Sequence, residues 1–205
     1  MAGIMDFSLL RKYHIPVVPY KIASSQSQAT IFSGQIGYPI ALKLISDKTP
    51  HKSEYHALSL NLKDANSVMR EFERLKKIDK KAKILVQKFI PHPIELIIGG
   101  KTDPQFGPTI LLGMGGIYTE ILEDVQMRIC PPSDSQIRSM VSQLKAFPIL
   151  KGARAQKGIN LLELCTILRK LSNLMEREQP AELDINPLIS TSKGLMAADV
   201  RVVKK

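Results

Sequence analysis

The sequence predicts an α+β protein made of two lobes, the first over residues 1–85 and the second over residues 86–205. The first eighty residues alternate helical and strand patterns, as in a small mixed lobe. The later residues combine apolar strands, two amphipathic helices and a C-terminal hairpin pattern. The chain has 205 residues and 44% hydrophobic content, enough for one domain with a sizeable core or for two small lobes that share a hinge.

The first lobe should open with a short helix and a strand on either side of Pro16, a residue that ends helices. A second helix has Ser25 as its N-cap and Gly37 as its stop signal. In chain order, the expected elements are a helix over Phe7–Tyr13, a strand over Val17–Ile22, a helix over Ser25–Gly37, strands over Tyr38–Ile45 and Leu58–Leu62, and a helix capped by Asp64 that runs to about Lys77.

The second lobe should be a mixed sheet with helices on it. Its early part is rich in glycine, with six of the twelve glycines of the chain between Gly99 and Gly116. The expected elements are strands over Lys83–Phe89, Ile94–Ile98, Tyr118–Leu122 and Gln126–Ile129, helices over Asp134–Lys145 and Leu161–Arg177, and strands over Ala181–Ile185 and Leu195–Val203 joined by Ser190–Gly194.

The chain is basic, with a formal net charge of +10 and a pI near 9.6, which favours anionic partners. Its densest cationic run, Arg74–Lys81, lies at the end of an expected helix, where cations oppose the negative end of the dipole. A solvated helix end, an acidic or phosphorylated partner and nucleic acid are all compatible with such a run. The run contains no interleaved aromatic residues, so we expect no nucleic-acid binding. We also expect a cytoplasmic protein without membrane association, because no apolar run is long enough to span a bilayer.

Oxygen-bearing side chains recur in the C-terminal hairpin. Alternation along a strand places Glu182, Asp184 and Asn186 on one face, and Asp199 and Arg201 on one face of the returning strand. Carboxylate and amide oxygens suit Mg²⁺, which takes one or two protein ligands and leaves its other positions to water and phosphates. A polar solvent-facing strand is the alternative explanation.

Two charged residues interrupt apolar strands. Lys43 lies within Ile40–Ile45, and Glu95 lies within Ile94–Ile98. A lysine in a buried strand must extend to solvent or meet an anion, whereas a lysine in an edge strand can instead block aggregation. One such lysine and one such glutamate on successive lobes favour a cleft.

The segment Gly113–Gly116 offers backbone N–H groups that could bind phosphate, but it lacks the ending of a P-loop. A tight turn is the alternative.

Taken together, these segments resemble a known family. They occur in order over nearly the whole chain: Leu10–Val18 (LRKYHIPVV), Gly37–Lys43 (GYPIALK), His51–Ser53 (HKS), Gly99–Pro108 (GGKTDPQFGP), Gly113–Ile117 (GMGGI) with Glu120, and Glu182–Leu188 (ELDINPL). The pattern is similar to that of the beta subunits of ADP-forming acyl-CoA synthetases of the acetate–CoA ligase type, relatives of succinyl-CoA synthetase. The resemblance implies an ATP-grasp fold with ATP or ADP bound in a cleft between two lobes.

The resemblance also implies roles for individual residues. Lys43 would bind a nucleotide phosphate, Glu95 would hold the ribose, and the hinge Gln87–Ile90, with Gln87, Lys88 and Ile90, would contact adenine. The metal-binding residues would be Asn186 and Asp199, with Asp184 close by. His51 would carry the phosphoryl group, and Arg154 would lie near the phosphates.

The reaction implied by the resemblance is acyl-CoA + ADP + phosphate to acid + CoA + ATP, run reversibly with Mg²⁺. Coenzyme A binding and a first phosphohistidine would belong to a separate alpha subunit, in an α2β2 assembly.

The sequence departs from the family pattern at the loop after the HKS motif. Two glycines usual there are replaced in Glu54–Ala57, another is replaced by Ala155, and Lys88 replaces a usual acidic residue. Glycine permits close backbone approach and positive φ, which other residues resist. Two interpretations follow, a working catalytic subunit with an altered loop, or a catalytically degenerate ATP-grasp protein that binds nucleotide or a partner without phosphoryl transfer.

Overall fold

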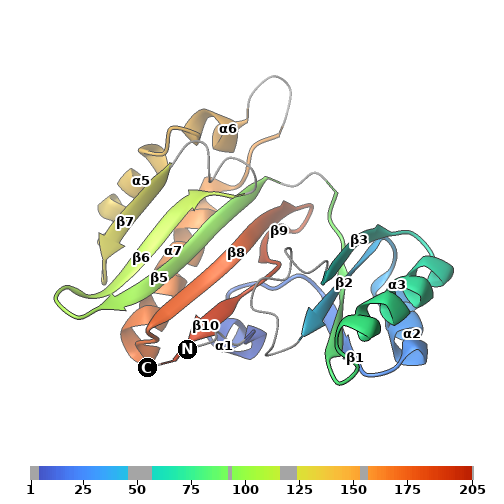
Figure 1. Cartoon of the computed structure of the whole chain (residues 1–205). Helices are drawn as coiled ribbons and strands as arrows, with labels where there is room; N and C mark the ends of the chain where they lie inside the picture. The colour runs from blue at the N-terminus through green and yellow to red at the C-terminus, as the bar shows by residue number, and fades with distance from the viewer. Residues whose placement is uncertain (1–4, 46–56, 92–93, 116–123, 153–156, 205) are drawn as a thin grey trace. The chain divides into compact units, whose positions relative to one another are not determined.

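The structure is a computed structural model that describes residues 5–45, 57–91, 94–115, 124–152 and 157–204 (Figure 1). These residues form two compact units, one within Val18–His92 and the other within Gly3–Val17 and Pro93–Lys205. The units divide the chain differently from the expected boundary at residues 85 and 86. The N-terminal segment groups with the later residues, because its helix packs on them.

The unit within Val18–His92 is an antiparallel sheet with two helices. Its strands follow the order β1-β4-β2-β3. Its elements are β1 (Tyr20–Ala23), α2 (Gln26–Ile36), β2 (Ile40–Ile45), β3 (Leu58–Leu62), α3 (Ala65–Ile78) and β4 (Lys83–Lys88). The helices and the alternate strand residues Ile40, Leu42, Leu44, Ile84 and Val86 share one hydrophobic core. The core therefore lies on one face of the sheet.

The helix ends of this unit confirm the expected capping signals. The Ser25 side chain accepts a hydrogen bond from the Gln28 backbone at 3.2 Å, and Gly37 ends α2 with a φ of 87°. The Asp64 carboxylate accepts from Ser67 N at 2.7 Å. At the other end of α3, the Lys76 ammonium donates to the carbonyls of Lys80 and Ala82, so part of the cationic run closes the helix end.

The second unit is built on a six-stranded antiparallel sheet. Its strands follow the order β10-β8-β5-β6-β7, and β9 pairs with β8. Its elements are α1 (Phe7–Lys12), β5 (Glu95–Asp103), β6 (Gly107–Met114), β7 (Val125–Ile129), α5 (Asp134–Ser142), α6 (Phe147–Lys151), α7 (Leu161–Glu178), β8 (Glu182–Thr191), β9 (Gly194–Ala197) and β10 (Arg201–Val203). In Figure 1, α5 and α7 lie behind this sheet.

Close contact between α7 and the sheet depends on a glycine. A Cβ at Gly100 would lie 2.2 Å from the Thr109 carbonyl oxygen and 3.0 Å from the Met175 side chain of α7. No larger residue fits there without a shift. Leu183 and Ile185 of β8 are buried, as the alternation along this strand predicted.

The N-terminal helix is held to the rest of the second unit at its C-terminal end and by the residues that follow it. The Lys12 ammonium and the Tyr13 hydroxyl each contact the Glu178 carboxylate at 2.6 Å. Beyond the helix, Lys170 Nζ donates to His14 O, and Ala197 N donates to Pro16 O at 2.8 Å. Residues from the two ends of the chain thus complete one unit.

Three features differ from the sequence prediction. Strand β6 was not expected, because its Gly-Pro start and its glycine near the end are signals typical of turns. Helix α6 was not expected either. The returning strand over Leu195–Val203 is broken into β9 and β10 at Ala198–Val200. The strand predicted over Tyr118–Leu122 lies entirely outside the described residues, which resume at Asp124.

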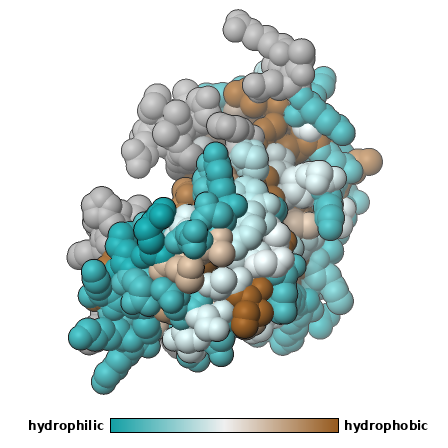
Figure 2. Space-filling view, turned by 90° about the vertical axis from the view of Figure 1, so that its right-hand side faces the viewer, coloured by the Kyte–Doolittle hydropathy of each residue, from teal (hydrophilic) through white to brown (hydrophobic). Residues whose placement is uncertain are grey.

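No helix in the described ranges is long and apolar enough to cross a membrane. In the view of Figure 2, hydrophilic residues cover most of the surface nearest the viewer, and hydrophobic residues gather in one larger area toward the top and in smaller patches elsewhere.

Candidate functional site

Strand β8 carries the oxygen-bearing side chains of the candidate metal site. Glu182 and Asn186 are exposed and Asp184 is half-buried, while the alternate residues Leu183 and Ile185 are buried. Residues paired across antiparallel strands share a face, so Arg201 of β10, which pairs with Asp184, points to the same side. Sequence reasoning gave Arg201 no role, although strand alternation already placed it beside the acidic residues.

The ladder around Asn186 is irregular. Leu96 pairs with Leu188 and Ile98 pairs with Ile185, so β8 contains one residue more than β5 over this stretch. This extra residue, at Asn186 or Pro187, lies where β9 and β10 are also interrupted, and Ala198 N donates to Pro187 O at 2.9 Å. A bulge of this kind redirects side chains and is common next to functional sites. It brings the loop that carries Asp199 beside the strand that carries Asn186.

The environment of Asp184 is rich in negative charge. Burial, followed by the Glu182 carboxylate, raises the pKa of Asp184 from 3.8 to about 6; Asp199 adds to the rise, and Arg201 opposes it. The carboxylate of Asp199 accepts a hydrogen bond from Val200 N at 2.8 Å. Among the described residues, no three His, Cys, Asp or Glu side chains form a metal-binding group.

Glu95 begins β5 at the end of the same sheet. Burial raises the pKa of its carboxyl group. Its backbone carbonyl accepts from Gly115 N at 2.8 Å, and a Cβ at Gly115 would lie 3.0 Å from Glu95 backbone and side-chain carbons. Gly113 is a strand residue that pairs with Ile97 and Val125. Within the glycine-rich segment, Gly113 and Gly115 therefore take part in the backbone hydrogen bonding and close packing of the sheet. Gly116 lies outside the described residues.

In the other unit, Lys43 lies in an inner strand. Strand β2 runs between β4 and β3, so the edge-strand alternative for Lys43 is wrong. Only 7% of Lys43 is exposed, as expected for an apolar strand covered on both faces. Lys43 pairs with Leu85, and Ala41 pairs with Gln87, which is 2% exposed. Lys43 and Gln87 therefore share the face of the sheet that lies away from α2 and α3.

Lys88 is not brought together with these two residues. It follows Gln87 in β4 and so points to the opposite face, where its ammonium donates to the backbone carbonyls of Gly37 (2.9 Å) and Tyr38. These carbonyls follow the end of α2, a position where cations are favourable. Ile90 is half-buried just beyond the strand.

Two of the expected catalytic residues lie outside the described residues. These are His51 and Arg154, together with most of the altered loop Glu54–Ala57, Glu120 and Ala155.

A model of the ATP-grasp domain matches residues 4–203 of the chain. The chain belongs to the ATP-grasp family. Among proteins of this family, it is 34% identical over 203 residues to subunit beta of the ADP-forming acetate–CoA ligase I of Pyrococcus furiosus. This match covers 95% of the present chain and 88% of that subunit. It places the chain among the beta subunits of ADP-forming acyl-CoA synthetases.

A second relative is a longer protein. The ADP-forming acetate–CoA ligase I of Archaeoglobus fulgidus is 36% identical over 210 residues, which are 99% of this chain but only 31% of that protein. The ATP-grasp chain is thus a part of a larger polypeptide in some relatives and a separate subunit in others.

Solved structures agree with this assignment. The dinucleotide-forming acetyl-coenzyme A synthetase 1 of Candidatus Korarchaeum cryptofilum, in complex with coenzyme A, Ca-AMPCP and HgCl⁺, matches with a TM-score of 0.91 and 32% identity over 100% of this chain and 94% of that chain. The same enzyme in complex with coenzyme A and Mg-AMPPCP, with its phosphohistidine segment pointing towards the nucleotide binding site, gives a TM-score of 0.85 at 31% identity, covering 100% of this chain and 93% of that chain. The predicted ATP-grasp fold is confirmed.

Proposed function

We propose that this chain is the nucleotide-binding beta subunit of an ADP-forming acyl-CoA synthetase and transfers a phosphoryl group reversibly between a partner subunit and ADP through His51. The observation that carries the proposal is the group of Asp184, Asn186 and Asp199 around the β8 bulge, in a chain that matches such subunits almost from end to end. Because relatives that bind nucleotide analogues share the fold at above 30% identity, ATP and ADP are the nucleotides we assign.

Several of the residues predicted from the family resemblance would hold the nucleotide. Lys43 and Gln87 share one sheet face, so the Lys43 ammonium would bind a phosphate while Gln87 begins the segment to Ile90 that contacts adenine. Glu95, at the start of β5, would accept hydrogen bonds from the ribose. Arg154 would lie near the phosphates. Lys88 would not touch the adenine base. Its ammonium would instead anchor the Gln87–Ile90 segment by donating to the Gly37 carbonyl at the end of α2.

The residues around Asp184 fit a divalent cation. After burial, the carboxylates of Glu182 and Asp199 raise the pKa of Asp184, and Arg201 lowers it. Asn186 and Asp199 would hold Mg²⁺, with Asp184 close by, and the ion would neutralise charge on the phosphate oxygens when bound.

His51 would act as a nucleophile in its neutral form. One imidazole nitrogen bonds to phosphorus as the phosphoryl group leaves the partner's donor, and the resulting P–N bond stores the energy of transfer. In the second step a terminal oxygen of ADP bonds to phosphorus, the P–N bond breaks and the imidazole is restored. Lys43 would offset the charge that develops on the transferring group.

A CoA-binding alpha subunit would supply the rest of the reaction, in an α2β2 assembly. The presence of a partner is supported by the one-chain relative, of which this chain matches only 31%. The degenerate alternative rests on Glu54–Ala57 and Ala155, and nothing among the described residues favours it.

Mass spectrometry of the intact assembly tests the proposal. With the alpha subunit, acyl-CoA and phosphate, the chain should gain an acid-labile, base-stable phosphoryl group that ADP removes as ATP forms. His51→Ala should abolish the label, and His56→Ala, the matched control from the same loop, should keep it. Loss of the label only in His56→Ala would move the nucleophile. Absence of both label and ATP in the wild type would overturn the proposal.

A further inference from the structure

Three polar side chains connect helix α3 to strand β3. The Arg74 guanidinium donates to the Glu71 carboxylate at 2.6 Å and to the Ser59 hydroxyl at 2.8 Å. The Ser59 hydroxyl in turn donates to the same Glu71 oxygen at 2.7 Å. We name Arg74, Glu71 and Ser59 the Arg74 network. The first residue of the predicted cationic run is therefore bound within the protein.

The Arg74 network is held together by charge. Hydrogen bonds from Arg74 and then from Ser59 hold the pKa of Glu71 below its usual value, so its carboxylate is ionised at neutral pH. Hydrogen bonds to ionised groups are shorter and stronger than those between neutral groups. Ser59 is buried, with only 7% of its surface exposed. The network is thus a firm connection between the helix and the strand.

The Arg74 network also reaches the backbone of the residue that pairs with Lys43. Arg74 Nη2 donates to Leu58 O at 3.3 Å, and Leu58 pairs with Lys43. Leu44 N donates to Ala57 O at 2.9 Å, which makes the next pair along the ladder a hydrogen-bonded one. Because the two kinds of pair alternate, Lys43 and Leu58 form a non-hydrogen-bonded pair. The Leu58 carbonyl therefore points to the free edge of the sheet, where Arg74 binds it.

Leu58 lies beside the Lys43 side chain. Paired residues of antiparallel strands share a face, with Cβ atoms about 4.5–5.5 Å apart. Leu85 of β4 pairs with Lys43 on its other side. The apolar stem of Lys43 is thus flanked by two leucines on the face away from the helices.

The pairing of β3 with β2 is weak in two respects. β3 is an edge strand of only five residues. Its ladder is also interrupted, since Ile40 pairs with Leu62 and Leu42 pairs with Ser59, which leaves one extra residue in β3. Asn61 takes a φ of 57° at this irregularity. A bulged edge strand disrupts the ladder locally, so its position depends on other contacts, and the Arg74 network supplies them.

We propose that Arg74, Glu71 and Ser59 are positioning residues for Lys43. They fix the start of β3, so that Leu58 confines the lysine stem and the ammonium is oriented before a nucleotide phosphate binds. A lysine has many rotamers, and restricting them before binding improves affinity. This inference rests on the proposed function, in which Lys43 binds the phosphate.

A comparison of two ligands with the full chain tests the inference. Mg·ADP carries the phosphates that Lys43 would bind and adenosine carries none, so the ratio of their dissociation constants reports on Lys43 rather than on overall stability. Arg74→Met should weaken Mg·ADP binding about threefold or more and leave adenosine binding unchanged. Ser59→Ala should act in the same direction, and because it removes only a hydroxyl group, it remains informative if Arg74→Met does not fold. In a Lys43→Met background, Arg74→Met should have no further effect on the ratio.

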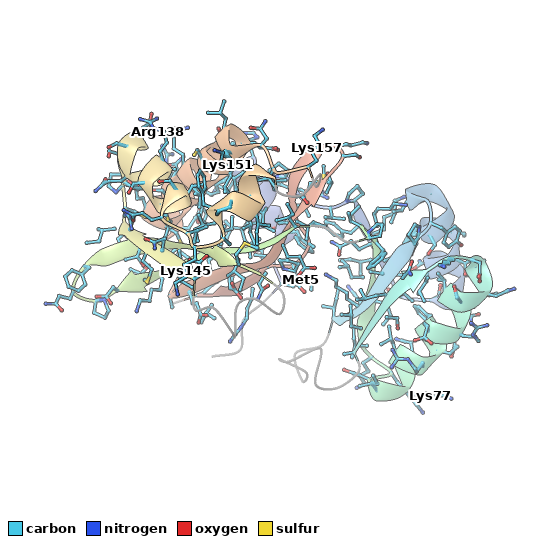
Figure 3. All side chains as sticks on the ribbon, turned by 90° about the horizontal axis from the view of Figure 1, so that it is seen from above. Met5, Lys77, Arg138, Lys145, Lys151 and Lys157 are labelled. Carbon is cyan, nitrogen blue, oxygen red and sulfur yellow. The ribbon has the colours of Figure 1, made fainter. Side chains whose placement is uncertain are left out.

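Lys77→Met is the matched control. Lys77 is an exposed cation of the same helix, and its side chain extends outward from α3 in Figure 3. Its replacement removes the same charge as Arg74→Met but no contact with β3, so both dissociation constants should stay at the wild-type values.

The remaining outcomes separate the two proposals. An unchanged ratio in Arg74→Met and Ser59→Ala, with a lowered Mg·ADP affinity in Lys43→Met, would overturn the positioning role and leave the proposed function intact. An effect of Arg74→Met that persists in the Lys43→Met background would also overturn it, because the network would then act without Lys43. If Lys43→Met itself left the ratio unchanged, the role of Lys43 in the proposed function would fail.

Discussion

Two lysines expected to bind nucleotide, Lys43 and Lys88, lie on opposite faces of one sheet. Lys43 is buried on the face away from the helices, next to Gln87. The Lys88 ammonium donates to the carbonyls of Gly37 and Tyr38 at the end of α2. The resemblance to the family suggested a ligand role for both lysines. The face to which each side chain points depends on strand register, and a sequence motif carries no information about register.

Replacing each lysine by methionine should separate the two roles, since methionine keeps the apolar stem. Lys43→Met should weaken Mg·ADP binding by about 1–3 kcal/mol, as expected for a lost charge-assisted contact. Lys88→Met should leave that affinity unchanged but lower the melting temperature, because two carbonyls lose their donor. Calorimetry and thermal unfolding measure the two effects. Equal nucleotide affinity in Lys43→Met and wild type would refute the role given to Lys43.

Asp184 makes stability depend on pH. Its pKa rises from 3.8 to about 6 on folding, so the fold favours the protonated form. The stabilisation from this group is complete below 3.8 and is lost as pH rises through about 6. Asp184→Asn should therefore be more stable than wild type by about 1–3 kcal/mol at pH 7–8, with a gap that closes as pH falls toward 4. Urea unfolding over this pH range measures the gap.

Asp103→Asn is the control of opposite sign. Backbone N–H groups of Gln105 and Phe106 hold the pKa of Asp103 below its usual 3.8. Its contribution is lost only as pH falls through that lower pKa, so Asp103→Asn should show no change in relative stability between pH 4 and 7. A gap for Asp184→Asn that does not vary over this range would contradict the role of burial.

At the scale of elements, capping residues made the helices predictable. Ser25 and Asp64 begin α2 and α3 as the sequence indicated, because a capping bond is local. The return strand was not predictable in the same way. Its break at Ala198–Val200 accompanies an extra residue in β8, and that mismatch arises between strands far apart in sequence. The alternation of residues along β8 thus predicted its acidic face, whereas the position of Asp199 near that face depends on how the strands pair.

Gly100 shows how an element can depend on one missing side chain. Gly100→Ala should destabilise the chain by about 1–3 kcal/mol, because its Cβ would meet the Thr109 carbonyl at 2.2 Å and the Met175 side chain at 3.0 Å. Gly34→Ala, in α2, is the control. Nothing lies within 4 Å of a Cβ there, so alanine should stabilise the helix by about 0.5–1 kcal/mol. Denaturant unfolding of both variants is the measurement, and a neutral Gly100→Ala would show that α7 can move away from the sheet.

At the scale of the whole molecule, the discontinuous unit predicts where a core substitution acts. Leu10 of α1 and Leu75 of α3 are both fully buried, and each replacement by alanine should cost about 2–5 kcal/mol. Leu10→Ala should increase hydrogen exchange in β9 and α7, although these elements follow it by more than 150 residues. Leu75→Ala should increase exchange in β2 and β4. Loss of protection in β2 from Leu10→Ala would contradict the division of the chain into these units.

The discontinuity also sets an order of events during synthesis. Residues 18–91 form a contiguous unit that can fold soon after it leaves the ribosome. Helix α1 is made earlier, but Lys12 and Tyr13 must wait for Glu178, which follows them by 166 and 165 residues. At about 5–20 residues per second, this delay is roughly 8–33 seconds. The side of α1 that is buried in the finished fold, with Phe7 and Leu10, is therefore exposed throughout that interval and open to capture by a chaperone.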